Sequence, residues 1–133
     1  MDAALVRQVW QRAGNCCEYC RMLQEFDENT FEIDHIIAKQ HDGLTVAGNL
    51  ALSCFYCNAF KGPNIAGRDR VTKKLVPLFN PRRHKWERHF RWQGGYLIGR
   101  TPIGRVTTVL LNINAPIRVE LREELITEGS FPP

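Results

Sequence analysis

The sequence predicts an α+β fold built from short helices and short strands, and three observations predict it. Residues 2–14 place apolar side chains at the i, i+3, i+4, i+7 spacing of a helix, between a capping aspartate and a glycine. Residues 31–35 alternate apolar and polar side chains, which is typical of a short strand. Residues 91–98 contain two adjacent glycines between strand-like runs, the pattern of a hairpin.

Turn residues divide the rest of the N-terminal half. A loop with two glycines at residues 39–48 separates the first strand from a second apolar stretch at residues 50–52. Cys54 then opens a short helix, which Gly62-Pro63 ends because neither residue favours a continuing helix.

In the C-terminal half, the sequence predicts one or two helical turns at residues 83–90, followed by the hairpin at residues 91–98. Thr101-Pro102 predicts the start of a helix, since a capping side chain followed by proline is typical of a helix N-terminus. Asn114 is expected to cap a final helix that ends near Gly129. The buried face of that helix is expected to consist of the apolar residues at helical spacing, Ile117, Leu121 and Leu125.

Composition is typical of a soluble globular protein. The chain has 133 residues, of which 44% are hydrophobic and 24% are charged. This length suits one domain, so we expect a single domain over residues 1–133. No apolar run approaches the ~20 residues that cross a bilayer, and the polar start does not resemble a secretory signal. We therefore expect a cytoplasmic protein without a membrane partner, in which five cysteines stay reduced and favour a metal site over disulfides.

Charge is distributed unevenly along the chain. Residues 61–105 hold 12 basic side chains and two acidic ones, whereas the rest holds six basic and 12 acidic side chains. Five aromatic residues lie within the same basic block. This pattern favours a polyanionic partner such as nucleic acid, because cations displace the counterions of phosphates. A solvated basic face over an aromatic core is the alternative interpretation.

Two C-x2-C pairs, Cys17 with Cys20 and Cys54 with Cys57, have the spacing of a zinc site. Four thiolates in this arrangement can bind one Zn2+ tetrahedrally. The 33 residues between the pairs exceed the 15–20 of a compact zinc ribbon, so a folded segment is expected between them. Two alternatives stay open: a shifted pairing that uses Cys16, and four ordinary buried cysteines.

Polar residues in and after this segment indicate chemistry beyond a structural zinc site. Asp34 and His35 end the first strand, Asn49 precedes the second, and Asn58 follows the last cysteine, with Lys61 three residues later. Two strands and a helix can bring such side chains together, and a purely structural zinc ribbon does not require them.

Together these motifs resemble the HNH endonuclease family, the ββα-metal class of nucleases. The resemblance covers residues 14–62 and is carried by Glu32-Ile33-Asp34-His35-Ile36, by Gly48-Asn49-Leu50, and by Cys54-x-x-Cys57-Asn58-x-x-Lys61-Gly62. It implies a ββα-metal nuclease core that a four-cysteine zinc site holds together, followed by a basic and helical extension at residues 63–133.

The resemblance also implies roles. His35 would be the general base that activates water, and Asn49 would brace the loop and orient His35. Asp34 and Asn58 would hold one catalytic divalent metal, Mg2+ or Mn2+. Lys61 would contact a phosphate. The structural zinc would be bound by Cys17, Cys20, Cys54 and Cys57.

DNA is the substrate that the family implies, and the basic block offers candidates for its phosphates. These candidates are Arg82, Arg83, Lys85 and Arg88. The sequence leaves two other functions open: a zinc-containing module that binds nucleic acid without cutting it, and a nuclease that acts on RNA.

Overall fold

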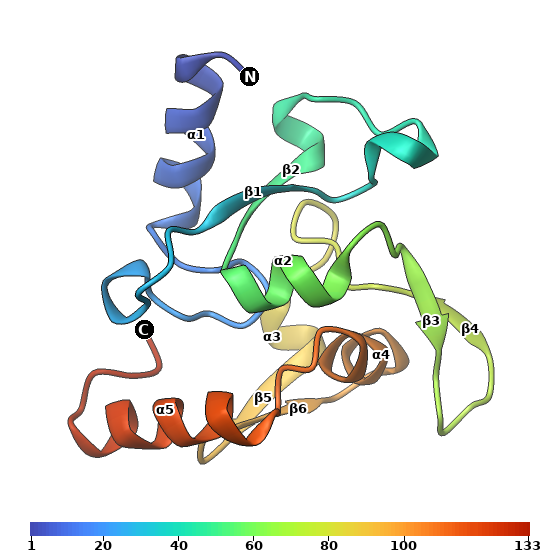
Figure 1. Cartoon of the computed structure of the whole chain (residues 1–133). Coiled ribbons are helices and arrows are strands. Elements are labelled where there is room, and N and C mark those ends of the chain that lie inside the picture. Colours follow the sequence, from blue (N-terminus) through green and yellow to red (C-terminus); the bar gives the residue numbers. More distant parts are fainter.

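The computed structural model describes residues 1–133, and its N-terminal half contains two helices and one hairpin (Figure 1). The regular elements are α1 (Ala3–Ala13), β1 (Glu32–His35), β2 (Leu50–Ser53) and α2 (Phe55–Lys61). Single 3-10 turns occur at η1 (Gln24–Phe26), η2 (Lys39–His41) and η3 (Ala47–Asn49). The predicted caps of the first helix are confirmed: Asp2 accepts a hydrogen bond from the Leu5 amide, and Gly14 ends α1 at φ 61°.

The C-terminal half adds two hairpins and three helices. Its elements are β3 (Ala66–Arg68), β4 (Leu75–Pro77), α3 (Trp86–His89), β5 (Phe90–Gln93), β6 (Tyr96–Gly99), α4 (Pro102–Leu110) and α5 (Pro116–Thr127). The strands form three separate two-stranded antiparallel sheets, β1-β2, β3-β4 and β5-β6. The predicted α+β class is therefore confirmed.

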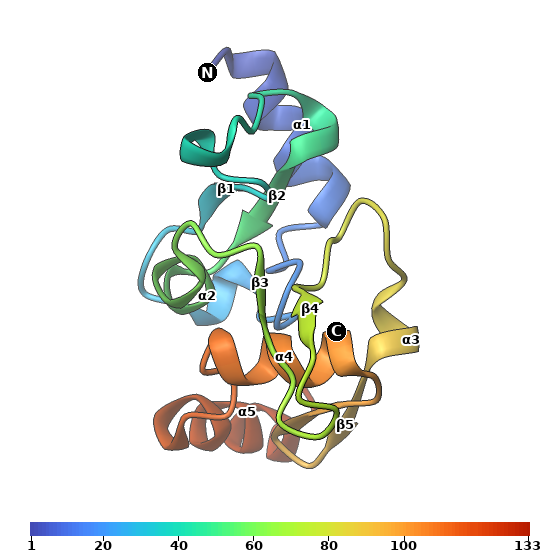
Figure 2. The same ribbon diagram turned by 90° about the vertical axis from the view of Figure 1, so that its right-hand side faces the viewer.

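The hairpin β3-β4 is the element that the sequence did not predict. Its strands have three residues each, too few for an alternating pattern to stand out. Tertiary contacts stabilise it instead: Asp69 in its turn forms a two-bond ion pair with Arg105 of α4. Figure 2 shows this hairpin beside α4.

The prediction that Asn114 caps the last helix is wrong. Ala115 is the residue before α5, and no side chain caps that end. The Asn114 side chain instead accepts from the Leu97 amide at 2.9 Å and donates to the Leu97 carbonyl at 2.8 Å. These two bonds extend the edge of β6, so Asn114 attaches the connection between α4 and α5 to the hairpin β5-β6.

The predicted buried face of α5 is also wrong, apart from Leu125. Ile117 is 65% exposed and Leu121 is 38% exposed. The helix is rotated so that Arg118 and Arg122, at 6% and 1% exposure, face the interior. The apolar spacing is helical, but the buried face consists of Arg118, Val119, Arg122 and Leu125.

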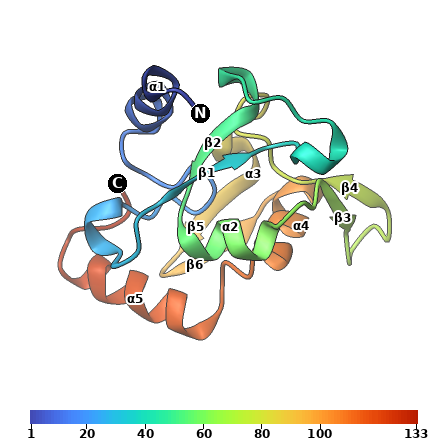
Figure 3. The same ribbon diagram turned by 45° about the horizontal axis from the view of Figure 1, so that its top comes forward.

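One hydrophobic core joins the two halves of the chain. Its 22 buried residues run from Val9 in α1 to Phe131 near the C-terminus. Trp86 and Phe90 belong to it and Trp92 packs against it, as expected for core aromatics. α4, α5 and the hairpin β5-β6 lie beneath α2 in Figure 1, and Figure 3 shows α2 alongside the hairpin β1-β2. None of the helices has both the length and the apolar character to span a membrane.

A buried hydroxyl joins α4 to the chain before α3. Thr107 is fully buried, and its Oγ1 accepts from the Phe79 amide at 2.9 Å and donates to the Ile103 carbonyl at 2.7 Å. Thr107→Val leaves the Phe79 amide without an acceptor, which costs roughly 1–3 kcal/mol of unfolding free energy. Urea denaturation measures this loss. Thr127→Val, at an exposed position on α5, is the control and is expected to change stability by less than about 0.5 kcal/mol.

Candidate metal centre and active site

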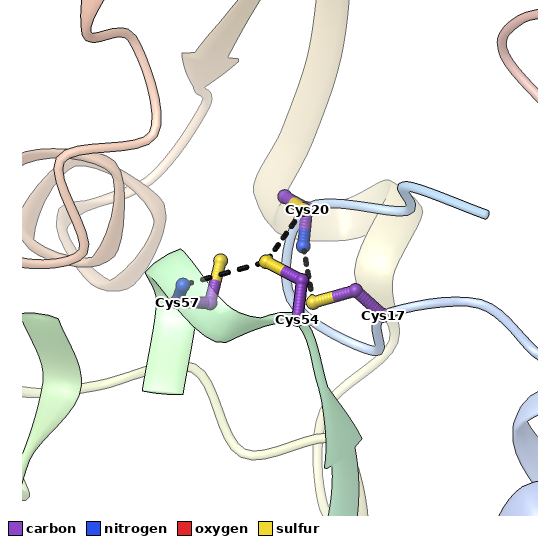
Figure 4. A group of neighbouring side chains, drawn as sticks. All are labelled: Cys17, Cys20, Cys54 and Cys57. Carbon is purple, nitrogen blue, oxygen red and sulfur yellow. Dashed lines mark hydrogen bonds between the residues drawn. The ribbon is translucent and has the colours of Figure 1, made fainter. Parts of the chain in front are cut away.

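Four cysteine sulfurs converge at one buried point (Figure 4). Cys17 and Cys20 come from the turn after α1, and Cys54 and Cys57 come from the start of α2. All four Sγ atoms lie within 4.8 Å of one another, and each residue is at most 2% exposed. A tetrahedral zinc with Zn–S bonds of about 2.3 Å separates its sulfurs by about 3.8 Å, so the cluster has the size of a zinc site.

Local backbone geometry arranges each C-x2-C pair. The Cys20 amide donates to Cys17 Sγ at 3.5 Å, and the Cys57 amide donates to Cys54 Sγ at 3.4 Å. In the second pair this bond is also the N-terminal cap of α2. Cys16 is not part of the cluster, so the shifted pairing is not formed.

The C-terminal half of the chain contacts both cysteine pairs. In the first pair, Glu18 binds the Arg82 guanidinium, and the Tyr19 carbonyl accepts from Trp86 Nε1 at 2.9 Å. In the second pair, Arg118 of α5 donates to Cys57 Sγ at 3.0 Å. Arg82 was expected to bind a DNA phosphate. Its side chain is only 15% exposed and is paired with Glu18, so it is not free for that role.

His35 lies at the end of β1, where the hairpin opens into a loop. Its Nε2 is 2.8 Å from the Thr45 hydroxyl, and the ring is partly exposed. Partial burial and the nearby Lys39 lower the pKa of His35, so the imidazole is neutral at pH 7.

Asn49 fixes the loop that carries Thr45. Its Oδ1 accepts from the Ile37 amide at 2.9 Å, and its Nδ2 donates to the carbonyls of Ile37 at 3.0 Å and Leu44 at 2.9 Å. These bonds join the two ends of the connection between β1 and β2. The geometry suits the bracing role that the family resemblance gives to Asn49.

Asp34 points away from His35 into the interior, as adjacent residues of a strand do. It is 6% exposed; its Oδ2 accepts from the Tyr19 hydroxyl at 2.7 Å and lies 3.0 Å from Lys61 Nζ. Burial raises the pKa of Asp34, and the Lys61 ammonium and the Tyr19 hydrogen bond oppose that change. Burial also raises the pKa of Tyr19 well above its usual value, so its hydroxyl keeps the proton that it donates.

Lys61 has a different environment from the one expected. Its side chain is 1% exposed, and its Nζ also donates to the carbonyls of His35 and Ile36 at 3.1 Å each. A phosphate cannot reach an ammonium group enclosed in this way. Lys61 instead fixes the end of β1, including the backbone of His35.

Asn58 and Glu32 form a second contact between α2 and β1. Asn58 Nδ2 donates to the Glu32 carboxylate. Asn58 lies about one helical turn before Lys61, which contacts Asp34. Asp34 and Asn58 therefore face the same side of β1, but each binds another partner. Glu32 was not among the predicted site residues, although its position two residues before Asp34 puts it on the same face of the strand.

Basic residues of the segment 83–89 line a shallow cleft at α3. The cleft residues are Arg83, His84, Lys85, Arg88 and His89. His84 Nδ1 accepts from the Asn80 amide at 3.0 Å, and burial and Arg83 lower the pKa of His84. Burial, His84 and Arg88 likewise lower the pKa of His89. Neighbouring positive charges are the second cause of both shifts, because the cleft gathers several basic side chains.

Comparison with known protein families identifies the region around these residues. Residues 17–63 match the family model described as HNH endonuclease. The matched segment begins at the first cysteine of the cluster and includes β1, β2 and α2. Residues 17–63 are thus similar to HNH endonucleases, and this segment carries a four-cysteine cluster consistent with a zinc site, as the sequence motifs indicated. No curated protein and no solved structure matches the chain.

Metal analysis tests the cysteine cluster directly. We expect about one zinc per purified chain, because four sulfurs at this spacing complete a tetrahedral site. Cys54→Ser is expected to lose the zinc and to unfold the segment around it, since binding energy at such sites is folding energy. Cys16→Ser is the matched control and is expected to keep full zinc content and stability. A folded, zinc-free Cys54→Ser chain would contradict the structural role of the metal.

Proposed function

We propose that this protein is a divalent-metal-dependent endonuclease that hydrolyses phosphodiester bonds of DNA, with His35 as the general base. The match of residues 17–63 to the HNH endonuclease family implies nuclease activity. The observation that carries the finer proposal is the position of His35: it is partly exposed, bonded to Thr45 and neutral at pH 7.

A general base must accept a proton from the attacking water. A neutral imidazole can do so, and the lowered pKa of His35 keeps it neutral over more of the acidic range than an ordinary histidine. The Thr45 hydroxyl and the loop held by Asn49 restrict the orientation of the ring. General-base catalysis of this kind contributes roughly 10²–10⁴-fold in rate.

Asp34 and Asn58 are the residues that family position assigns to the catalytic metal. Both Asp34 oxygens are bonded, to Tyr19 and Lys61, so a metal at this carboxylate would have to displace the Lys61 ammonium. Carboxylate and amide oxygens are suitable donors for Mg2+ or Mn2+, which take few protein ligands. Asn58 donates through Nδ2 to Glu32, which leaves its Oδ1 available and places a second carboxylate beside it. When bound, the metal would neutralise charge on the phosphate and on the leaving oxygen.

The basic block supplies the surface for nucleic acid. With Lys61 and Arg82 committed to internal contacts, the exposed cations of the cleft at α3 are Arg83, Lys85 and Arg88. Cationic side chains without a carboxylate partner favour phosphate, because binding releases the counterions of the nucleic acid. We therefore assign phosphate binding to this cleft.

Cleavage of plasmid DNA tests the proposal. Purified protein is expected to nick supercoiled plasmid with Mg2+ or Mn2+ and not with excess chelator. His35→Ala is expected to reduce the rate by roughly 10²–10⁴-fold, because the proton acceptor is removed. His41→Ala, at an exposed position in the same loop region, is the matched control and is expected to cut like the parent.

Zinc content and circular dichroism of both histidine variants verify that they are folded. Equal cutting by His35→Ala and the parent would show that His35 is not the base. DNA binding without cleavage under any divalent metal would favour a non-catalytic binding module. Preferential cleavage of structured RNA would favour an RNA nuclease.

The salt dependence of DNA binding tests the cleft. Replacing Arg83, Lys85 and Arg88 with alanine is expected to lower the slope of log Kd against log salt by roughly one unit for each phosphate that is no longer bound. The matched control removes three exposed cations of the β3-β4 hairpin, Arg70, Lys73 and Lys74. Equal reductions of the slope in both triple variants would mean that net charge, and not this cleft, holds the nucleic acid.

A further inference from the structure

Arg118 is an arginine in direct contact with the sulfur cluster. It lies on the first turns of α5, is 6% exposed, and its Nη2 is 3.0 Å from Cys57 Sγ and 3.7 Å from Cys54 Sγ. Its Nη1 donates to the carbonyls of Leu111 at 2.8 Å and Asn112 at 3.1 Å. Every acceptor of this guanidinium is therefore either a neutral carbonyl or a cysteine sulfur.

Arg122, one turn further along α5, is buried in the same way. It is 1% exposed, and its guanidinium donates to the carbonyls of Gly95 at 2.7 Å and Ile113 at 2.8 Å. No ion pair with a carboxylate involves Arg118 or Arg122. Both arginines line one cleft together with Cys20 and Cys54.

Two buried cations without carboxylates need negative charge nearby, because an unpaired charge in the interior is costly. Four thiolates with one Zn2+ carry a net charge of −2. Arg118 and Arg122 bring two positive charges to the cleft that they share with Cys20 and Cys54. Asp27 and Glu28 also line this cleft but form no ion pair with either arginine. The sulfur cluster and the two arginines are thus electrostatically complementary when the metal is bound.

The orientation of α5 supports this complementarity. Burying the arginine face leaves Ile117 and Leu121 on the exposed side, at 65% and 38% exposure. The buried face also carries the apolar residues Val119 and Leu125, so their packing and the bonds of Arg118 and Arg122 together compensate for the exposure of Ile117 and Leu121.

From these observations we propose that α5 is part of the zinc site: Arg118 and Arg122 neutralise the zinc tetrathiolate, and zinc binding and the docking of α5 are one coupled step. The proposal rests on the zinc site and not on nuclease activity. Arg118 and Arg122 lie outside the matched segment 17–63, and the proposal gives them a role at the cysteine cluster within that segment.

Zinc affinity measured by competition with a chromogenic chelator tests the role of Arg118. Arg118→Met removes the charge and the hydrogen bond to Cys57 and is expected to weaken zinc binding roughly 10–100-fold, as removal of outer-shell partners does. Arg118→Lys keeps the charge and is expected to weaken it less. Arg7→Met, at an exposed position on α1, is the charge-matched control and is expected to remain within about twofold of the parent. Parent-like affinity of Arg118→Met would overturn the proposal.

A spectroscopic measurement separates charge neutralisation from simple support of the fold. In the cobalt-substituted protein, Arg118→Met is expected to shift the sulfur-to-cobalt charge-transfer band to lower energy, because the sulfur electrons lose a neighbouring cation. Leu125→Ala, which truncates a buried apolar side chain of the same helix, is expected to lower stability and leave the band in place. An unshifted band in Arg118→Met, or an equal shift in Leu125→Ala, would overturn the proposed role of the charge.

Hydrogen exchange on the unmodified chain decides the question if Arg118→Met does not fold. Removing zinc with a chelator is expected to increase exchange at residues 116–127 together with residues 17–20 and 54–57. Continued protection of residues 116–127 after the cysteine segments have opened would overturn the coupling. Neither this measurement nor the zinc competition uses nuclease activity, so a failed cleavage assay leaves their outcomes unaffected.

Discussion

The convergence of four cysteine sulfurs is the constraint on which the rest of the molecule depends. The sulfurs join the turn after α1 to the start of α2, two segments that are separated by 33 residues of the chain. This junction sets where α2 begins and therefore which of its side chains lie over β1. Cys54 and Cys57 lie at the first turn of this helix, from which Asn58 and Lys61 extend to Glu32 and Asp34.

The site is built on a hairpin that would not be stable alone, since two strands of four residues bury too little surface. Its stability comes from three sides. Arg12 of α1 donates to the carbonyls of Ala47 and Leu50, Lys61 of α2 holds the end of β1, and Glu18 accepts from the Leu52 amide at 2.9 Å. The position of His35 thus follows from contacts made by residues that take no part in the proposed chemistry.

The sequence predicted the elements with strong local signals: the capped first helix, the two strands between the cysteine pairs, and the hairpin with its two glycines. It failed where contacts distant in sequence decide the outcome. From the sequence, Lys61 and Arg82 look like exposed cations. In the structure Lys61 pairs with Asp34 and Arg82 pairs with Glu18, and these partners lie far away in the sequence. The face of α5 was misassigned because Arg118 and Arg122 find buried acceptors that a hydrophobic pattern does not reveal. Glu32 was detectable in principle, since strand alternation places it beside Asp34.

Tyr19 connects the turn of the first cysteine pair to two other parts of the molecule. It lies between Cys17 and Cys20, and its hydroxyl is bonded to Asp34 while its carbonyl is bonded to Trp86. Any change in the turn at Cys17–Cys20 would therefore reach the Asp34 carboxylate through the hydrogen bond of Tyr19. The sulfur cluster and the end of β1 are thus coupled through one side chain, and disturbance of the thiols need not touch β1 directly to alter it.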